Sequence, residues 1–163
     1  MVERAWPEPV ERVAAFLRSS GVDGRVEEFP GGTPTATDAA EACGCELAQI
    51  VKSLLFLCDG RPVLVLVPGD RRADGKKVAA EAGAQKAKIT AAAEVERATG
   101  FEPGGVAPFP LQDVSEVLME RTLLSHDVVW FGAGSTSHMG AVAPADLARL
   151  THARTVDAVQ APA

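Results

Sequence analysis

Hydrophobic positions recur at helical spacing near the start of the chain and then change to strand spacing. Between residues 8 and 20, apolar side chains fall three and four positions apart, which predicts an amphipathic helix. Gly21 can end that helix in the left-handed conformation. Residues 25–29 then predict a short, half-exposed strand closed by a proline and two glycines.

A second helix is expected after the turn-rich residues 33–38. Thr37 or Asp38 can cap its start, with Glu41 placed to complete a capping box. Apolar residues on one face continue to about Val51, and Gly44 is a weak point inside the helix. The pattern therefore predicts a helix that leads directly into the next strand.

The strongest fold signal is a pair of apolar runs, Leu54–Cys58 and Val63–Val67. They flank Asp59-Gly60, a dipeptide suited to a tight hairpin, and Pro62 is tolerated at the start of the second strand. Neither run alternates with polar residues, so both strands are expected to be covered on both faces and to lie centrally in the sheet.

The second half of the chain continues as short elements. Helices are predicted over residues 77–83, 91–99 (capped by Thr90) and 144–150, and strands over residues 114–118, 128–131 and 139–142. The proline- and glycine-rich residues 101–110 cannot form a helix. We expect one domain over residues 1–150 and a flexible tail over residues 151–163.

Composition limits the class of protein. A chain of 163 residues, 47% hydrophobic and 23% charged, is typical of a soluble globular domain with a real core. No apolar run is long enough to span a membrane, and the N-terminus lacks the apolar stretch of a signal peptide. Three cysteines without framework spacing indicate a reducing compartment, so a cytoplasmic protein is expected.

Lys52 is chemically out of place, because it stands where the predicted second helix meets an apolar strand. A lysine charge resists transfer out of water. One interpretation is that its stem lies on the core while its ammonium stays in solvent. The other is that the ammonium is directed into a pocket, where burial would lower its pKa. Position alone leaves both open.

Residues 69–88 run against the acidic balance of the chain, whose net charge is -6. Six cations and three anions give this stretch a charge of +3. The cations are Arg71, Arg72, Lys76, Lys77, Lys86 and Lys88. The stretch is either an ordinary solvated surface or a footprint for phosphates, whose affinity would fall steeply with salt.

Several kinds of catalytic site are absent from the sequence. The histidines at positions 126, 138 and 152 lack the spacing of a zinc site, and there is no P-loop, GxGxxG or GxSxG motif. The adjacent Ser125-His126-Asp127 cannot line up as nucleophile, base and orienting group. No metal or cofactor is therefore expected.

Three segments remain as candidate chemistry: Lys52-Ser53, the loop at residues 104–108, and the glycine-rich residues 132–135. A rigid loop of glycine and proline can present backbone N–H groups to a carbonyl or oxyanion. Together with a lysine, such loops suit a metal-free pocket for an ester or a phosphate. Taken singly, each glycine segment is as well explained by an ordinary turn.

In this order, the segments resemble the YbaK/EbsC family of trans-editing aminoacyl-tRNA deacylases, relatives of the editing domain inserted in bacterial prolyl-tRNA synthetases. The resemblance spans about residues 25–150. It rests on Thr35, the Ala39-Ala40…Gly44 segment, Gln49 to Leu54, Gly69-Asp70 with Lys76-Lys77, Thr99-Gly100-Phe101, Gly104 to Phe109, and Gly132 to Ser135. It implies an α/β (α+β) fold: a single domain with a mixed, strongly curved β-sheet or half-barrel flanked by helices.

The resemblance also implies roles for the matching positions. Lys52 would hold the 3′-terminal adenosine or its phosphate, with Ser53 as the neighbouring hydroxyl. The loop of Gly104, Gly105, Val106, Ala107 and Pro108 would grip the aminoacyl carbonyl and act with Lys52 in catalysis. Phe29, Thr35, Gly134 and Ser135 would complete the substrate site, and Arg71, Arg72, Lys76 and Lys77 would face the tRNA. The acidic residue that some members carry downstream of the serine has no counterpart that the sequence places here.

The implied function is removal of cysteine or alanine from a mischarged tRNA, with tRNA-Pro as the first candidate and prolyl-tRNA synthetase as a candidate partner. Catalysis would be metal-free and substrate-assisted, with the terminal ribose hydroxyl, a bound water or the substrate thiol doing the chemistry. Two alternatives stay open: a non-catalytic module that binds tRNA or a synthetase, and a small-ester hydrolase without a nucleic-acid partner. The sequence leaves the amino acid, the tRNA and the oligomeric state undetermined.

Overall fold

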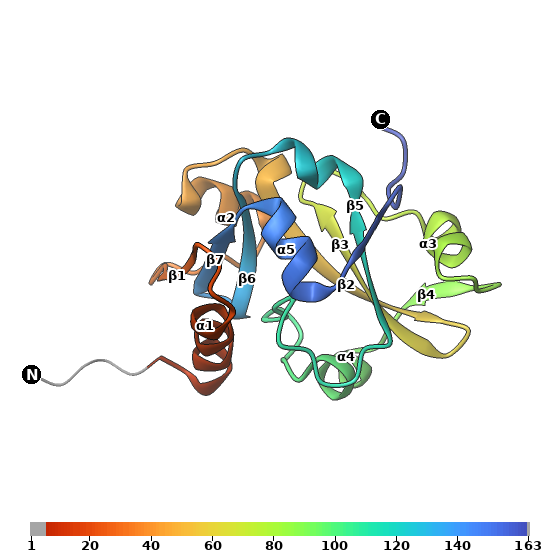
Figure 1. The fold of residues 1–163 in the computed structure, drawn as a ribbon, viewed down its shortest axis with the longest axis horizontal. Coiled ribbons are helices and arrows are strands. Elements are labelled where there is room, and N and C mark those ends of the chain that lie inside the picture. The colour runs from red at the N-terminus through yellow and green to blue at the C-terminus, as the bar shows by residue number, and fades with distance from the viewer. Residues whose placement is uncertain (1–5, 163) are drawn as a thin grey trace, which may run out of the picture.

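The computed structural model describes residues 6–162, which form a curved mixed sheet flanked by helices (Figure 1). The helices are α1 (Glu8–Ser20), α2 (Ala36–Cys43), α3 (Gly75–Glu81), α4 (Ala92–Thr99) and α5 (Pro144–Thr151), with 3-10 turns η1 (Leu47–Gln49) and η2 (Arg121–Ser125). The strands are β1 (Gly24–Glu28), β2 (Ile50–Cys58), β3 (Arg61–Pro68), β4 (Ala87–Ile89), β5 (Glu116–Glu120), β6 (Val129–Ser135), β7 (His138–Val142) and β8 (Arg154–Val156).

Seven strands follow one another in the order β1-β7-β6-β2-β3-β5-β8, and β4 pairs with β2 beside this row. The pairs β2–β6, β3–β5 and β5–β8 are parallel, and the other pairs are antiparallel. The sheet curls into a half-barrel, so the predicted fold class is confirmed. No helix of the described chain is long and apolar enough to cross a membrane.

The predicted hairpin is confirmed as the centre of the sheet. β2 and β3 pair from Val51 and Pro68 to Cys58 and Arg61, and the turn places Asp59 and Gly60 at positive φ. All of β3 after Pro62 is buried because its two faces pack into different clusters. Leu64 and Leu66 join the main core, while the alternate valines pack beneath α3 and the C-terminal segment. Coverage on both faces explains the continuous apolar run.

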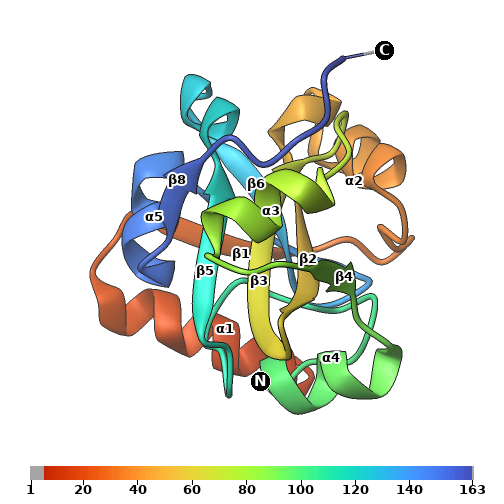
Figure 2. The same ribbon diagram turned by 90° about the vertical axis from the view of Figure 1, so that its right-hand side faces the viewer.

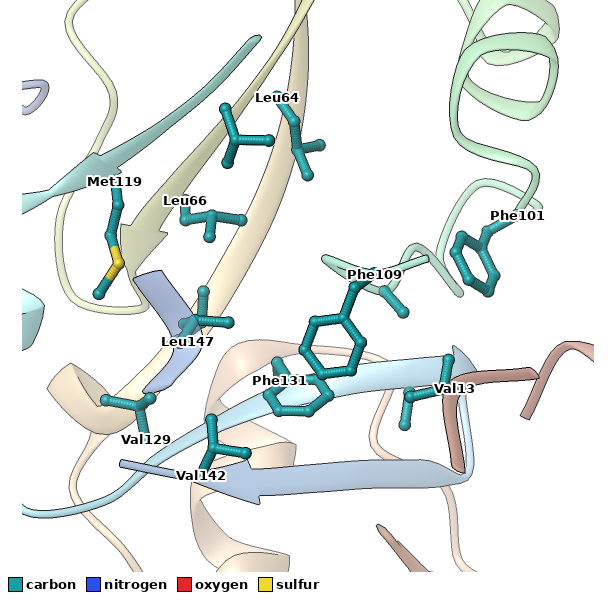
Figure 3. Packing of buried hydrophobic residues seen from close by; sticks show 14 of the residues in the cluster. Val13, Leu64, Leu66, Phe101, Phe109, Met119, Val129, Phe131, Val142 and Leu147 are labelled. Atoms are coloured by element: carbon teal, nitrogen blue, oxygen red, sulfur yellow. The ribbon is translucent and has the colours of Figure 1, made fainter. Parts of the chain in front are cut away.

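The main core packs the sheet against α1, α5 and the loop after α4 (Figure 3). Phe109, from the irregular stretch after α4, lies against Phe131 of β6 with ring centroids 5.1 Å apart and an interplanar angle of 62°. Val13 of α1 and Leu147 of α5 belong to the same cluster. The proline-rich loop is therefore anchored in the core by its aromatic side chain, which fixes the backbone next to it.

The second helix is shorter than predicted. Thr35, rather than Thr37 or Asp38, caps α2, because its Oγ1 accepts a hydrogen bond from the Asp38 N–H at 3.1 Å. The Thr35 hydroxyl also donates a hydrogen bond to the Asp38 carboxylate, so Asp38 is the partner of the capping residue. The predicted capping box with Glu41 is therefore wrong. Gly44 has a φ of 68° and ends α2 in the left-handed conformation that glycine adopts freely. Lys52 consequently lies inside β2 and not at its mouth.

The prediction of a flexible tail over residues 151–163 is also wrong for the described part. β8 pairs in parallel with β5, and Val156, Ala158 and Val159 are buried. The buried Glu120 accepts a hydrogen bond from the Ala158 N–H at 2.9 Å. The tail is ordered by partners far away in the sequence, which a three-residue strand does not reveal by its own pattern.

Smaller differences concern the ends of other elements. β6 runs on through the glycines to Ser135, beyond the predicted end at Phe131, with an irregularity in its pairing to β7. α4 begins without a side-chain cap, so the expected role of Thr90 is wrong. β4 was not predicted, because three residues carry too little periodicity to read.

Candidate functional site

A pocket opens where β2 and β6 separate. The two strands pair only at Ile50 with Trp130 and at Val51 with Phe131. Just beyond these pairs, Lys52 of β2 and Gly132 of β6 line a cavity of about 320 Å³. The other lining residues are Thr33, Pro34, Thr35, Ala36, Ala39, Ile50, Val51, Ser53, Leu54, Gly104, Val106 and Met139. The parting of two strands thus brings together segments that are distant in the sequence.

Lys52 is half-buried at this pocket, and its ammonium is held in place. Nζ donates a hydrogen bond to the Arg71 carbonyl oxygen at 2.7 Å. Burial lowers the pKa of Lys52, the positive charge of Arg72 acts in the same direction, and the carboxylate of Asp70 opposes both. The Lys52 side chain lines the pocket, and its ammonium is engaged with the loop before α3 and does not extend freely into solvent.

Ser53 contributes a hydroxyl whose hydrogen-bonding capacity is unused. Its Oγ is buried and has no hydrogen-bond partner among the described residues. Most buried polar atoms in proteins are satisfied by the protein or by water. Ser53 lines the cavity, but its hydroxyl oxygen is itself buried, so a ligand reaches that oxygen only after the side chain or its surroundings shift.

The two glycine-rich segments pack against each other. A Cβ atom at Gly105 would lie 3.1 Å from the Gly134 carbonyl oxygen, and a Cβ atom at Gly134 would lie 2.8 Å from the Pro9 carbonyl carbon at the start of α1. Gly104 and Gly134 also have positive φ values of 88° and 100°. At Gly134, close approach and backbone conformation together require glycine, whereas at Gly104 the conformation alone favours it.

Only part of the predicted loop at residues 104–108 reaches the cavity. Gly104 and Val106 line it, whereas Gly105, Ala107 and Pro108 are buried and do not line it, and Pro108 faces a different cavity. The Gly105 N–H donates to the Glu102 carbonyl oxygen at 2.9 Å and is already used. The loop thus presents two of its five residues, and the other three support it.

Ser135 and Gly134 do not line the cavity. The Ser135 hydroxyl lies 2.6 Å from Nδ1 of His138 and accepts a hydrogen bond from the Ser137 N–H at 3.0 Å. His138 is 3% exposed, and its Nε2 lies 3.4 Å from the Glu28 carboxylate. Glu28 ends β1 and Ser135 ends β6, so the two residues are far apart in the sequence, and no motif spacing could have connected them.

The remaining predicted contacts divide in the same way. Phe29 packs edge-on against Trp130 and does not line the cavity. Thr35 does line it, although its hydroxyl is occupied in capping α2. Sequence reasoning missed Ala36 and Met139. Ala36 adjoins the quoted Thr35, whereas Met139 gave no signal.

The four cations predicted to face tRNA fall into two pairs. Arg71 donates to the Gln160 carbonyl oxygen, and Lys77 contacts the Asp157 carboxylate at 3.0 Å and the Val159 carbonyl oxygen at 2.8 Å. Arg72 and Lys76 are exposed. Arg71 and Lys77 are thus engaged with the C-terminal segment, and Arg72 and Lys76 are available to a partner.

Comparison with known proteins gives related chains. Residues 31–150 match the family described as the aminoacyl-tRNA editing domain. The uncharacterized protein YwhH of Bacillus subtilis is 34% identical over 130 residues, covering 79% of this chain and 82% of YwhH. The proline–tRNA ligase of Nitratidesulfovibrio vulgaris (strain DP4) is 33% identical over 99 residues, which cover 61% of this chain but only 17% of the ligase.

Solved structures agree with these relationships. A crystal structure described as a candidate trans-editing enzyme for prolyl-tRNA synthetase has a TM-score of 0.89 and 32% identity, and it covers 96% of this chain and 100% of its own. The crystal structure of the hypothetical protein APE2540 has a TM-score of 0.85 and 29% identity, and the match covers 94% of this chain and 100% of APE2540. The sequence match over residues 31–150 and the shared fold establish that the chain belongs to the aminoacyl-tRNA editing domain family.

Proposed function

We propose that this protein is a trans-editing deacylase that cleaves the ester joining a wrong amino acid to the 3′ end of a mischarged tRNA. The observation that carries the proposal is the pocket between β2 and β6, whose lining combines Lys52, with its ammonium held by the Arg71 carbonyl oxygen, with Ser53, Gly104 and Val106. The names of the prolyl-tRNA synthetase relatives make tRNA-Pro the first candidate substrate. Such a role would place the protein in the cytoplasm, with a synthetase as a candidate partner.

In this proposal the protein positions the ester and stabilises developing charge. Lys52 would contact the terminal adenosine or its phosphate, and Ser53 would bond the substrate beside it. Water attacks the ester carbonyl carbon, the bond from that carbon to the ribose oxygen breaks, and the proton from water passes to the ribose oxygen. The products are the free amino acid and tRNA with an intact 3′ end. Orientation and fixed dipoles can supply much of such a rate enhancement.

The apolar part of the pocket lining suits a small side chain. Ala36, Ala39 and Met139 provide apolar surface there without a charged group. Cysteine and alanine are both small enough to be candidates for the edited residue. With cysteine, attack by the substrate's own thiol on the ester carbonyl carbon is an alternative to attack by water. The C–S bond forms, the bond from that carbon to the ribose oxygen breaks, the thiol proton passes to the ribose oxygen, and cysteine leaves as its cyclic thiolactone.

The test is a deacylation panel with Cys-, Ala- and Pro-tRNA-Pro and Cys-tRNA-Cys. Wild type is compared with Lys52→Ala and with the control Arg18→Ala, which removes an exposed cation on α1. We expect release from one mischarged species and a loss of about 10²- to 10³-fold in rate for Lys52→Ala, as for the loss of a charge-stabilising group. The control should keep the native rate.

Other outcomes would select the remaining candidates. Binding of tRNA without release of any amino acid would favour a non-catalytic binding module. Equal rates for wild type and Lys52→Ala would refute the catalytic role of the lysine. Hydrolysis of small esters, with no discrimination among the tRNA substrates, would favour a small-ester hydrolase.

A further inference from the structure

Most positive side chains of the described residues are engaged with the protein itself. Arginines 12, 25, 97, 121, 149 and 154 and Lys77 lie near carboxylates, while Lys52, Arg61 and Arg71 donate to backbone carbonyls. In residues 6–162, five cations make no side-chain hydrogen bond or ion pair: Arg18, Arg72, Lys76, Lys86 and Lys88. Four of these five fall within residues 72–88, so the unpaired positive charge is concentrated in one region.

Three of these lysines line a single groove between α3 and β4. Lys76, Lys86 and Lys88 are all exposed, and the groove has a volume of about 610 Å³. Figure 2 shows α3 and β4 together on the face turned to the viewer. Lys86 is close enough to Asp59 for the two charges to act on each other, but none of the three lysine ammonium groups forms an ion pair within the described residues, so the groove is electrostatically suited to a polyanion.

The other polar groups of the groove do not cancel this charge. Asp74 is the one carboxylate in its lining, and its side chain caps α3 by accepting from the N–H groups of Lys76 at 3.0 Å and Lys77 at 3.3 Å. Gln85 and Gln160 add neutral amides. Three cations against one engaged carboxylate leave a net positive groove.

Arg72 connects this groove with the candidate site. The backbone N–H of Gln160, a groove residue, donates to the Arg72 carbonyl oxygen at 2.9 Å. Arg72 is also close enough to Lys52 for its charge to act on that ammonium. In the sheet, Lys88 pairs with Leu57, five residues along β2 from Lys52, which corresponds to about 17 Å of strand. That separation is on the scale of a few nucleotides.

We infer that the groove lined by Lys76, Lys86 and Lys88 binds the phosphate backbone of the RNA whose aminoacylated end enters the Lys52 pocket, with Arg72 between them. This inference rests on the proposed function for its choice of RNA. It replaces Arg71 and Lys77, which the C-terminal segment engages, by Lys86 and Lys88 as RNA-facing cations. Surface lysines of this kind contact phosphates without reading sequence.

The first experiment measures binding of an unmodified tRNA-Pro transcript at several salt concentrations. Lys76→Gln, Lys86→Gln and Lys88→Gln are each compared with wild type and with Arg18→Gln, which removes an exposed, unpaired cation outside the region. Each groove variant should reduce the slope of log affinity against log salt by about 1, while Arg18→Gln leaves it unchanged. Slopes that match wild type in all three groove variants would overturn the inference.

The second experiment separates this inference from the proposed function. The triple Lys→Gln variant is assayed on mischarged tRNA-Pro and on the matching aminoacyl-adenosine ester, which carries no phosphate. We expect a lower rate on tRNA and a native rate on the nucleoside ester. Equal losses on both substrates would show that the lysines act on the pocket, which contradicts an RNA groove. If wild type cleaves neither substrate, the deacylase proposal fails, while the salt slopes still decide the groove.

Discussion

Lys52 Nζ donates a hydrogen bond to the Arg71 carbonyl oxygen at 2.7 Å, and the Arg71 guanidinium in turn donates to the Gln160 carbonyl oxygen. One residue thus connects the pocket lysine with the C-terminal segment. The same segment is joined to the loop before α3 by the bond from the Asp74 N–H to the Ala158 carbonyl oxygen at 2.8 Å. The chain end therefore helps to hold the carbonyl that positions Lys52.

Arg71→Ala should slow deacylation even when the substrate has no tRNA backbone. The variant removes the bond to Gln160 and loosens the carbonyl that receives the Lys52 ammonium, and small misplacements of a catalytic group can cost up to about 10²-fold in rate. We expect about a 10-fold lower rate on an aminoacyl-adenosine ester, with an unchanged circular dichroism spectrum. Arg18→Ala is the control, and a native rate for Arg71→Ala would show that the C-terminal contact does not position the lysine.

Ser53→Ala should separate stability from activity. No hydrogen bond to the described protein is lost, and a desolvated hydroxyl is removed, so the free energy of unfolding should stay equal or rise by up to about 1 kcal/mol. Ser115→Ala is the matched control, because its Oγ donates to the Pro62 carbonyl oxygen at 2.9 Å and its loss should cost about 1 kcal/mol. Denaturant unfolding measures both, and deacylation should fall only in Ser53→Ala. A marked destabilisation by Ser53→Ala would mean that the hydroxyl has a structural partner.

The lowered pKa of Lys52 makes a signed prediction for stability against pH. Between the pKa of Lys52 in the folded protein and its usual value of about 10.4 in the unfolded chain, the unfolded state binds more protons. Stability conferred by the wild-type residue, relative to Lys52→Met, should therefore rise with pH through that window and be constant below it. Urea unfolding across alkaline pH measures the difference, with Lys88→Met as the exposed control. A difference that falls with pH would contradict the lowered pKa.

Gly134→Ala should destabilise the fold more than a glycine substitution at an open site. A Cβ atom at Gly134 would meet the Pro9 carbonyl carbon at 2.8 Å, and the backbone φ is 100°. Gly21 has a φ of 75° but no atom within 4 Å of the added Cβ, so Gly21→Ala isolates the conformational cost. We expect a loss of about 1 kcal/mol for Gly21→Ala and more for Gly134→Ala, measured by thermal unfolding. Equal losses of stability would show that α1 moves away from the added Cβ atom without an energetic cost.

The local pattern of the sequence determined the elements whose information is also local. The Asp59-Gly60 hairpin, the helix closed by Gly21 and the break at residues 101–110 each depend on turn chemistry or periodicity within a few residues. The ordered motifs around Lys52, Gly104 and Ser135 were enough to identify the family. The sequence also drew attention to Lys52, because a charge beside an apolar run is costly unless it has a partner.

Tertiary structure alone decided which of these residues share a surface. The parting of β2 from β6 placed Lys52 and Ser53 beside Gly104 and Met139, whereas the hydroxyl of Ser135 turned to His138. Pairing of β8 with β5 ordered the C-terminal segment, which engaged Arg71 and Lys77 and left the exposed lysines of the groove without partners. Such outcomes depend on contacts between residues far apart in the chain, and neither periodicity nor composition encodes those contacts.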